Sequence, residues 1–353
     1  LGDKLIIKRP ITATLWKNRM YQLDSPLHLL LFPGLSWVDK FRTAFLLGIL
    51  KLYPFWQPLE GITAEQLFTS IGGKRAWQTI WKPLLYGKFG DLAPTVAASW
   101  FWARIKKRTP RLGYIEGGFQ TLITALTRAI VRNGGKIYTG IAIDSVRNES
   151  GKSKNHNSVF IIPASPAGRH NSRFDAVLLT VPTPIAKIIA PIIPDSYFTI
   201  PSAIPHLHAQ TLILETREPI CASQPRKVSP CEANSKSVYW LNICDRSFPF
   251  LAVVAHTNFM NPKHYGGNHL TYFGNYLPQG HPYLSMTKKE LFKVFLPFIK
   301  RLTHNSKFVI HNSFLFIGPF AQPVHQLHYS RKAPQLVTPV PGLYLANMDS
   351  IYP

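Results

Sequence analysis

Cysteine, acidic residues and long hydrophobic runs are scarce in this sequence of 353 residues. The three cysteines, Cys221, Cys231 and Cys244, are too few and too unevenly spaced for a disulfide framework, so a reduced cytosol is the default setting. The best apolar run, Ala44 to Leu50, is shorter than the roughly 18 residues that a membrane-spanning helix needs. The sequence opens without an initiator Met or a signal-peptide pattern, and we expect it to be an internal piece of a longer protein.

Acidic residues are outnumbered by basic ones. The 17 Asp and Glu accompany 40 Lys and Arg, which gives a net charge of +23. This excess favours anionic partners such as phosphates, membrane surfaces or nucleic acid, and it is equally compatible with a general charge habit of the source organism. Hydrophobic residues make up 46% of the chain, which excludes a mostly disordered or fibrous protein. The length indicates about two domains.

Most familiar chemical motifs are absent as well. The sequence contains no G-x-x-x-x-G-K-[ST], H-E-x-x-H, G-x-S-x-G, C-x-x-C or G-x-G-x-x-G. His206 and His208 would share one face of a strand and could bind a metal ion with Cys221. Because no convincing third or fourth ligand accompanies them, the pattern favours ordinary surface histidines and no metal. The aromatic and basic residues from Trp100 to Arg108 could stack on nucleic acid, but core packing and a solvated helix end explain them better.

Apolar spacing and N-terminal capping patterns predict several helices. The residues from Leu35 to Leu52 repeat at helical spacing, and Thr63-x-x-Gln66 and Thr287-x-x-Glu290 are capping boxes. Pro94 is expected in the first turn of another helix. The clearest helix is amphipathic, runs from Phe119 to Ile130 and ends at Gly134-Gly135.

Runs rich in β-branched and aromatic residues predict strands in the rest of the chain. Those before residue 205 are Leu5–Lys8, Ala13–Trp16, Lys136–Thr139, Ile141–Val146, Ser158–Ile162 and Phe174–Val181. A second, mainly antiparallel sheet is expected from Gln210–Glu215, Val238–Ile243, Phe250–His256, Leu270–Tyr276 and Phe308–Ile317. The apolar segment Gly342–Ala346 is typical of a strand in a central parallel sheet.

A Gly-Gly pair precedes the amphipathic helix. The stretch Leu112-Gly113-Tyr114-Ile115-Glu116-Gly117-Gly118-Phe119-Gln120-Thr121-Leu122 leads into that helix, and a Gly-Gly stop and a strand pair follow the helix. Glycines at a helix entrance let the backbone approach a ligand closely and present free N–H groups, although they could merely permit a tight turn.

This stretch resembles the "K-G-G-x-x-x-L-x-x-A-L" segment of FAD-dependent amine oxidases, phytoene desaturases and, most closely, protoporphyrinogen oxidases. Three other places agree in the right order. Ser25-Pro26-Leu27 resembles their "S-S-P-L-D-L", and the residues from Lys82 to Asp91 resemble "E-P-F-x-x-G-[VI]-Y-x-G-D". The residues from Pro341 to Asn347 resemble "P-G-L-[YF]-L-A-G". The similarity covers nearly the whole chain.

The resemblance implies FAD as cofactor and assigns residues to its site. Gly117 and Gly118 would lie near the flavin, Ile143 would meet adenine, and Val181 and Pro182 would end the strand beside the nucleotide. Three residues near the pyrophosphate or ribityl chain complete the set: Ala346, Asn347 and Met348. The sequence departs from the family at Asn347, where many members have Gly, and at Lys88, where many have an aliphatic residue. No catalytic residue can be named from the resemblance.

The family's G-x-G-x-x-G element would lie upstream of Leu1 and its last flavin helix would begin after Pro353. We therefore expect residues 1–353 by themselves to bind FAD weakly or not at all. We also expect the segment from Gly113 to Ile130 to pack beside the strand at 342–346 in one domain.

The expected fold is α/β (α+β), with an incomplete Rossmann-like FAD-binding domain and a substrate domain with a mainly antiparallel sheet and helices. Residues 111–205 and 333–353 would form the FAD-binding domain, and 1–110 and 206–332 the substrate domain. The expected function is flavin-dependent oxidation of a C–N or C–C bond in an apolar or amine small molecule. The expected location is cytoplasmic, with possible peripheral attachment at the inner face of the cell membrane. The alternative is a non-catalytic basic protein that binds nucleic acid or anionic membrane.

Overall fold

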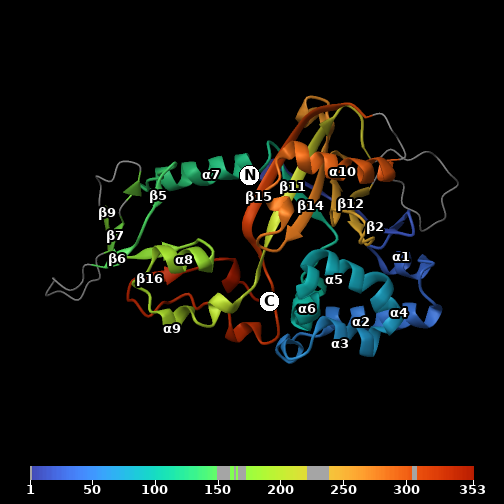
Figure 1. Cartoon of the computed structure of the whole chain (residues 1–353), viewed down its shortest axis with the longest axis horizontal. Coiled ribbons are helices and arrows are strands. Elements are labelled where there is room, and N and C mark those ends of the chain that lie inside the picture. The colour runs from blue at the N-terminus through green and yellow to red at the C-terminus, as the bar shows by residue number, and fades with distance from the viewer. Residues whose placement is uncertain (1, 149–159, 163, 166–171, 221–237, 304–307) are drawn as a thin grey trace. The chain divides into compact units, whose positions relative to one another are not determined.

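The computed structural model describes residues 2–148, 160–162, 164–165, 172–220, 238–303 and 308–353 (Figure 1). The chain folds into two compact units, and each is built from two stretches of sequence. Unit 1 contains Leu1–Thr121 and His206–Leu327, and unit 2 contains Leu122–Pro205 and His328–Pro353. The mixed α/β class predicted from the sequence is confirmed.

A seven-stranded sheet in the order β15-β11-β14-β13-β12-β2-β3 organises unit 1. Its strands are β2 (Ile11–Trp16), β3 (Arg19–Gln22), β11 (His206–Thr216), β12 (Val238–Ile243), β13 (Ala252–Ala255), β14 (His269–Leu277) and β15 (Ile310–Pro323). Strands β12 and β2 pair in parallel, and the other neighbours pair antiparallel. The prediction of a mainly antiparallel sheet is therefore confirmed.

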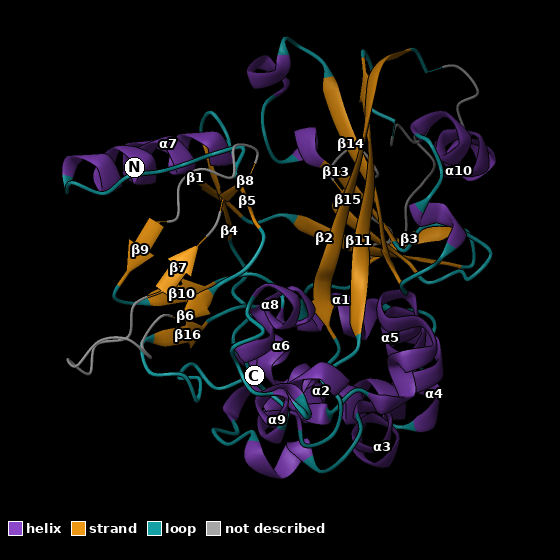
Figure 2. Cartoon of the chain, turned by 60° about the vertical axis from the view of Figure 1, so that its left-hand side comes forward, coloured by secondary structure: helices purple, strands orange, loops and turns teal. Residues whose placement is uncertain are grey.

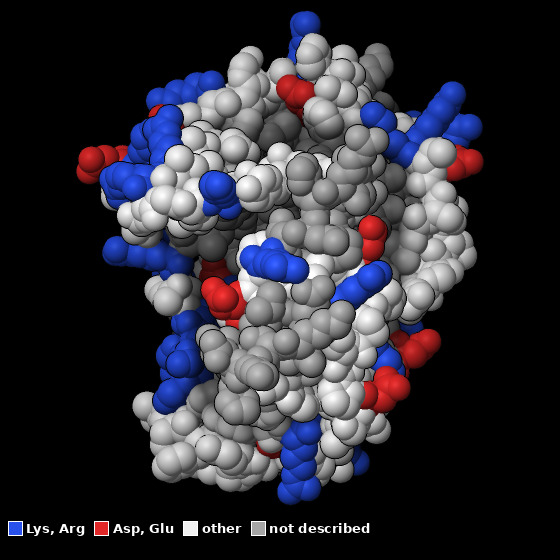
Figure 3. All heavy atoms as spheres, turned by 90° about the vertical axis from the view of Figure 1, so that its left-hand side faces the viewer, with Lys and Arg blue, Asp and Glu red and all other residues white. Residues whose placement is uncertain are grey.

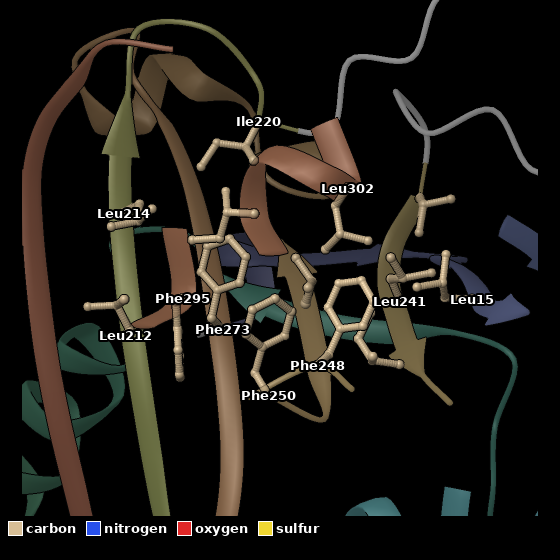
Figure 4. Close-up of a cluster of buried hydrophobic side chains, with 14 of the residues drawn as sticks. Leu15, Leu212, Leu214, Ile220, Leu241, Phe248, Phe250, Phe273, Phe295 and Leu302 are labelled. Atoms are coloured by element: carbon tan, nitrogen blue, oxygen red, sulfur yellow. The ribbon is translucent and has the colours of Figure 1, made fainter. Parts of the chain in front are cut away.

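One face of this sheet is covered by α10 (Lys288–Thr303), whose start carries the predicted capping box. Figure 4 shows Phe295 of the helix beside Leu212 and Phe273 of the strands, and Leu302 nearer to Leu241 and Phe248. Each large apolar side chain buried here contributes roughly 1.5–3 kcal/mol to stability. Because side chains alternate along a strand, Tyr272, Gly274 and Tyr276 point to the opposite face.

Helices form a second layer of unit 1 (Figure 2). They are α1 (Pro26–Leu31), α2 (Trp37–Leu52), α3 (Ala64–Leu67), α4 (Lys74–Ala76), α5 (Lys82–Phe89) and α6 (Ala98–Lys106). The capping box predicted at Thr63 and Gln66 opens α3. Wide π-helical turns at Phe68–Gly72 and Trp77–Trp81 link α3, α4 and α5. The layer packs around a buried aromatic cluster that includes Phe68, Trp77 and Phe101.

Pro94 does not lie in the first turn of an α-helix, so this prediction is wrong. It lies inside a tight 3-10 turn, Gly90–Thr95, and α6 begins only at Ala98. The reason is tertiary, since distant carbonyls hold the intervening backbone extended. The Ala97 N–H donates to the carbonyl of His325 at 2.9 Å, and the Ala98 N–H donates to that of Ile62 at 2.9 Å.

Unit 2 is built around a short parallel strand pair, β10 (Val177–Leu179) and β16 (Leu343–Leu345). Helices α8 (Thr183–Ile189) and α9 (Asp195–Phe198) follow β10, and side chains from 146 to 198 share a buried core with Leu343 and Leu345. Small antiparallel sheets are formed by the remaining strands: β5 (Ala142–Ile143), β6 (Arg147–Asn148), β7 (Phe160–Ile162), β8 (Ala164–Ser165) and β9 (Ser172–Phe174).

Two predictions for this region are wrong. Residues 136–139 form no strand, because Gly134 and Gly140 at positive φ bracket an irregular connection. The segment from Gly113 to Ile130 also does not pack as one piece beside β16. Strand β4 (Leu112–Ile115) pairs with β1 (Leu5–Lys8), which places it in unit 1, whereas most of α7 (Phe119–Arg132) belongs to unit 2 and has no buried residue. The polar loop predicted at 149–157 lies outside the described residues.

Candidate active site

Unit 1 encloses a cavity of about 450 Å³ between its helices and the sheet face opposite α10. Strands β11 to β14 form one wall, and α5, α6 and the Trp77–Trp81 turn form the other. Aromatic rings dominate the lining: Trp81, Trp100, Phe101, Trp240, Tyr272 and Tyr276. A cavity of this size and apolar character is a typical site for a small molecule.

Small residues keep the cavity open. A Cβ added at Gly274 would meet no heavy atom within 4 Å, and one at Gly87 would meet nothing closer than 3.9 Å. Ala209 and Ala252 line the same space from β11 and β13. The alternation of Tyr272, Gly274 and Tyr276 along β14 thus leaves a gap between two rings, where a flat apolar ligand has room.

Lys88 is the titratable group most deeply set in this lining. Its ammonium lies 4.4 Å from the centre of the Tyr276 ring and 5.7 Å from that of Trp100, which places it among cation–π partners. Burial, with a smaller contribution from the Arg104 guanidinium, lowers the pKa of Lys88 to about 7. The lysine therefore exchanges its proton near neutral pH.

The charged groups of the cavity all have one sign. The Arg104 guanidinium carbon lies 5.1 Å from the centre of the Trp100 ring. Arg108 and Lys88 also line the cavity. Within the part of the chain that the structure describes, no Asp or Glu lines this cavity. These fixed charges repel a cationic ligand and do not repel a neutral or anionic one.

A buried polar cluster supports Tyr272 from behind. His256 stacks on Tyr272 with the ring planes 14° apart, and its Nε2 is 2.6 Å from the hydroxyl of Tyr265. Burial lowers the pKa of His256 to about 4, so the ring is neutral at physiological pH. The hydroxyls of Tyr114 and Tyr239 are 2.9 Å apart in the same region. These contacts fix the orientation of the cavity wall.

In unit 2, the carboxyl ends of β10 and β16 bring five of the predicted site residues together. Val181 and Pro182 follow β10, and Ala346, Asn347 and Met348 follow β16. The Asn347 amide donates to the Val181 carbonyl at 2.9 Å, and the Ala346 N–H donates to the Leu179 carbonyl at 2.9 Å. Ligands of open α/β sheets bind at such carboxyl ends.

Two residues that the sequence did not single out organise this corner. Asp349 is 2% exposed, and its carboxylate accepts from the Thr183 hydroxyl at 2.5 Å and the Thr183 N–H at 3.3 Å. The Asn347 side chain closes the network by donating to the Thr183 hydroxyl and accepting from the Asp349 N–H. Burial of a carboxylate is costly unless such hydrogen bonds compensate it. The network joins the segment after β10 to the segment after β16.

The other predicted site residues lie elsewhere. Gly117 and Gly118 belong to unit 1, in the turn between β4 and α7, and both have positive φ. A Cβ at Gly118 would meet nothing within 4 Å, so its backbone faces open space. Ile143 lies in β5, which pairs with β8 and not with the β10–β16 sheet.

The histidines considered as metal ligands contact an aromatic ring. His206 and His208 both lie against Phe320, with ring centres 5.6 and 5.2 Å apart. Among the described residues, no group of three or more His, Cys, Asp or Glu could hold a metal ion. The helices described here are all too short or too polar to cross a membrane.

No protein-family model and no curated protein matches this chain. Solved structures do. A provisionally assigned protoporphyrinogen oxidase from Exiguobacterium sp. 255-15 has a TM-score of 0.68 at 14% identity, covering 99% of this chain and 78% of its own. An oxidoreductase from Methanosarcina mazei has a TM-score of 0.69 at 18% identity, over 98% and 77%. Putrescine oxidase bound to putrescine has a TM-score of 0.60 at 12% identity, over 98% and 78%.

The chain has the amine oxidase-type flavoenzyme fold. At these identities the likeness shows the fold alone. The predicted resemblance to FAD-dependent oxidoreductases is confirmed at that level.

The cavity residues Lys88, Arg108, Trp240 and Gly274 were not predicted as site residues. They come from α5, the loop after α6, β12 and β14, so no local pattern joins them. Two of them were noted in the sequence for other reasons: Lys88 stands where the resembled family has an aliphatic residue, and Arg108 ends the aromatic and basic run that begins at Trp100.

Proposed function

We propose that this chain belongs to an FAD-dependent oxidoreductase that oxidises a C–C or C–N bond of an apolar, uncharged or anionic small molecule. The observation that carries the proposal is the aromatic cavity of unit 1, whose charged lining groups are Lys88, Arg104 and Arg108. The fold shared with flavin-dependent enzymes supports the reaction class. FAD, when bound, supplies the redox chemistry by accepting a hydride equivalent.

The residues of unit 2 fit one wall of a dinucleotide site. The network of Asn347, Thr183 and Asp349 holds the ends of β10 and β16 in place. Val181, Pro182, Ala346 and Met348 would contact the cofactor from this wall. Gly117, Gly118 and Ile143 stay in the proposed set through the resemblance. The sequence offers no G-x-G-x-x-G turn for the pyrophosphate.

The cavity favours an apolar substrate over an amine. Putrescine oxidase binds a diamine, as its structure with putrescine shows. Among the described residues, the cavity offers a protonated amine no carboxylate and presents lysine and arginine instead. Trp100, Trp240 and Tyr272 give the cavity an apolar surface, which favours an apolar ligand.

The test compares two leucine substitutions in the natural gene product that contains this chain. Gly274→Leu fills the cavity, whereas Gly48→Leu on α2 adds the same side chain at another position with nothing within 4 Å. The measurement is anaerobic bleaching of bound FAD by 1,4-dihydronaphthalene, with benzylamine as the cationic comparator. We expect bleaching by the former only, lost in Gly274→Leu and kept in Gly48→Leu. Bleaching by benzylamine alone, or equal rates in both variants, would contradict the proposal.

We also propose peripheral attachment to an anionic membrane through α2. Trp37, Phe41 and Phe45 repeat every four residues along α2 and are about two-thirds exposed, and Leu52 extends the stripe at 80% exposure. Exposed aromatic and aliphatic stripes of this kind are uncommon on a free surface. On the face shown in Figure 3, Lys and Arg are scattered with Asp and Glu among them.

Vesicle flotation tests this attachment. It also distinguishes membrane attachment from the alternative that the protein binds only nucleic acid. The variant Phe41→Ser/Phe45→Ser removes the centre of the stripe, and Phe314→Ser/Phe316→Ser removes two exposed rings of β15 as a matched control. We expect binding to anionic vesicles at low salt that the first variant loses and the second keeps. Equal binding of both variants would refute attachment through α2.

A further inference from the structure

A second hollow of about 490 Å³ adjoins the aromatic cavity in unit 1. It is lined by the link between β1 and β2, by the loop 107–112 after α6, and by β12. Arg108, Trp240 and Asn242 line both spaces, so the two lie next to each other. The Trp240 indole N–H donates to the Asn242 side chain at 2.8 Å, which fixes the junction.

Basic side chains from separate elements converge on this hollow. Arg9 precedes β2, and Lys107, Arg108 and Arg111 lie on the loop after α6. The single acidic lining residue, Asp24, is already committed to other partners, since it accepts from Gln22 at 2.9 Å and contacts His28 at 3.0 Å and Arg9 at 3.9 Å. Among the residues that the structure describes, the side chains of Lys107, Arg108 and Arg111 form no ion pair.

The loop that carries these charges is held in place. The Lys51 ammonium donates to the carbonyls of Lys106 at 3.0 Å and Arg108 at 3.3 Å, and the Thr109 hydroxyl donates to the carbonyl of Arg111 at 2.9 Å. Pro110 restricts the backbone between them. A cationic cluster held this way is preorganised, so an anion that binds it loses little to reordering of the loop.

We propose that the two spaces form one site for an amphiphilic molecule, with its anionic head on Lys107, Arg108 and Arg111 and its apolar body in the aromatic cavity. The head is a carboxylate or a phosphate, because guanidinium groups pair with either in a bidentate manner. The proposal rests on the proposed function in one respect only: it names the substrate class of that same cavity. The binding itself requires no flavin.

Titration calorimetry with decyl phosphate, decanoate and decanol tests the site in the full chain. The variant Lys107→Gln/Arg111→Gln removes two charges from the hollow, and Lys74→Gln/Arg75→Gln removes two exposed charges from α4 as the control. We expect at least one anionic probe to bind about tenfold more tightly than decanol. We expect Lys107→Gln/Arg111→Gln and added salt each to abolish this preference for an anionic probe over decanol, and Lys74→Gln/Arg75→Gln to keep it. The ratio of decyl phosphate to decanoate affinity identifies the head group.

Equal affinity for the three probes, or equal losses in the two variants, would overturn the proposal. These outcomes are independent of the flavin test. A chain that binds FAD but shows no preference for anionic probes retains the proposed function and loses the amphiphile site. A chain that prefers anionic probes and never binds FAD loses the proposed function and retains the site.

Discussion

Replacing Lys88 by methionine is expected to stabilise unit 1 at neutral pH, although it removes a charge surrounded by aromatic rings. An unperturbed lysine has a pKa of about 10.4. In the folded chain the pKa of Lys88 is about 7, lowered first by burial and then by Arg104. At about 1.4 kcal/mol per pH unit, this difference opposes folding by about 4 kcal/mol at pH 7. Loss of the cation–π contacts with Tyr276 and Trp100 lowers the stability of the variant by about 1–2 kcal/mol. The net gain for Lys88→Met is thus about 2–3 kcal/mol.

The gain must depend on pH in a defined direction. Between pH 7 and about 10.4 the unfolded lysine keeps its proton and the folded one has lost it, so wild-type stability rises with pH in this window. The advantage of Lys88→Met therefore shrinks by up to about 1.4 kcal/mol per pH unit above pH 7. Lys82→Met on the same helix is the control, since Lys82 is exposed and its substitution is expected to change stability by less than about 0.5 kcal/mol.

Urea unfolding followed by tryptophan fluorescence measures the stability of unit 1, which contains Lys88. All eight tryptophans of the chain lie in unit 1, so the emission reports on that unit. A shift of the unfolding midpoint without a change of slope gives the stability difference. If Lys88→Met is less stable than wild type at pH 7, or if its advantage is the same at pH 7 and pH 9, the reasoning about the buried lysine is wrong.

Three further outcomes follow from the site. His256, with its pKa near 4, makes the free energy of unfolding fall as the pH drops below about 6.5, by at most about 1.4 kcal/mol per unit, and urea titrations of His256→Phe are expected to lose this slope. Asp349→Ala removes the acceptor of the Thr183 hydroxyl and N–H and is expected to destabilise unit 2 by about 1–3 kcal/mol, seen as faster hydrogen exchange at Leu343–Leu345; unchanged exchange would refute the network's role. Residues 1–353 alone are expected to retain little FAD after gel filtration, because their sequence has no G-x-G-x-x-G; stoichiometric FAD would show that expectation to be wrong.

Local features of the fold were predictable because their causes lie within a few residues. The capping boxes at Thr63 and Thr287 open helices, and the alternating strand at Val238–Ile243 forms as predicted. The exceptions have distant causes. The helix expected at Pro94 begins only at Ala98, because the carbonyls of His325 and Ile62 accept from the N–H groups of Ala97 and Ala98.

The same contrast separates the two parts of the candidate site. Asn347 belongs to a continuous sequence motif, so it could be predicted from the sequence. Its hydrogen bonds with Thr183 and Asp349 could not, because they depend on the pairing of β10 with β16. The cavity corresponds to no continuous sequence motif. Lys88 and Gly274 are nearly two hundred residues apart and meet through packing of α5 on β14.

The central claim is that this chain serves FAD-dependent oxidation of an apolar, non-cationic molecule. The most direct measurement is the visible absorption spectrum of the natural gene product that contains these residues, recorded before and after anaerobic addition of 1,4-dihydronaphthalene. The account predicts a stoichiometric oxidised-flavin spectrum that bleaches on addition of this donor and not of benzylamine. A colourless protein that takes up no FAD on reconstitution would contradict the account.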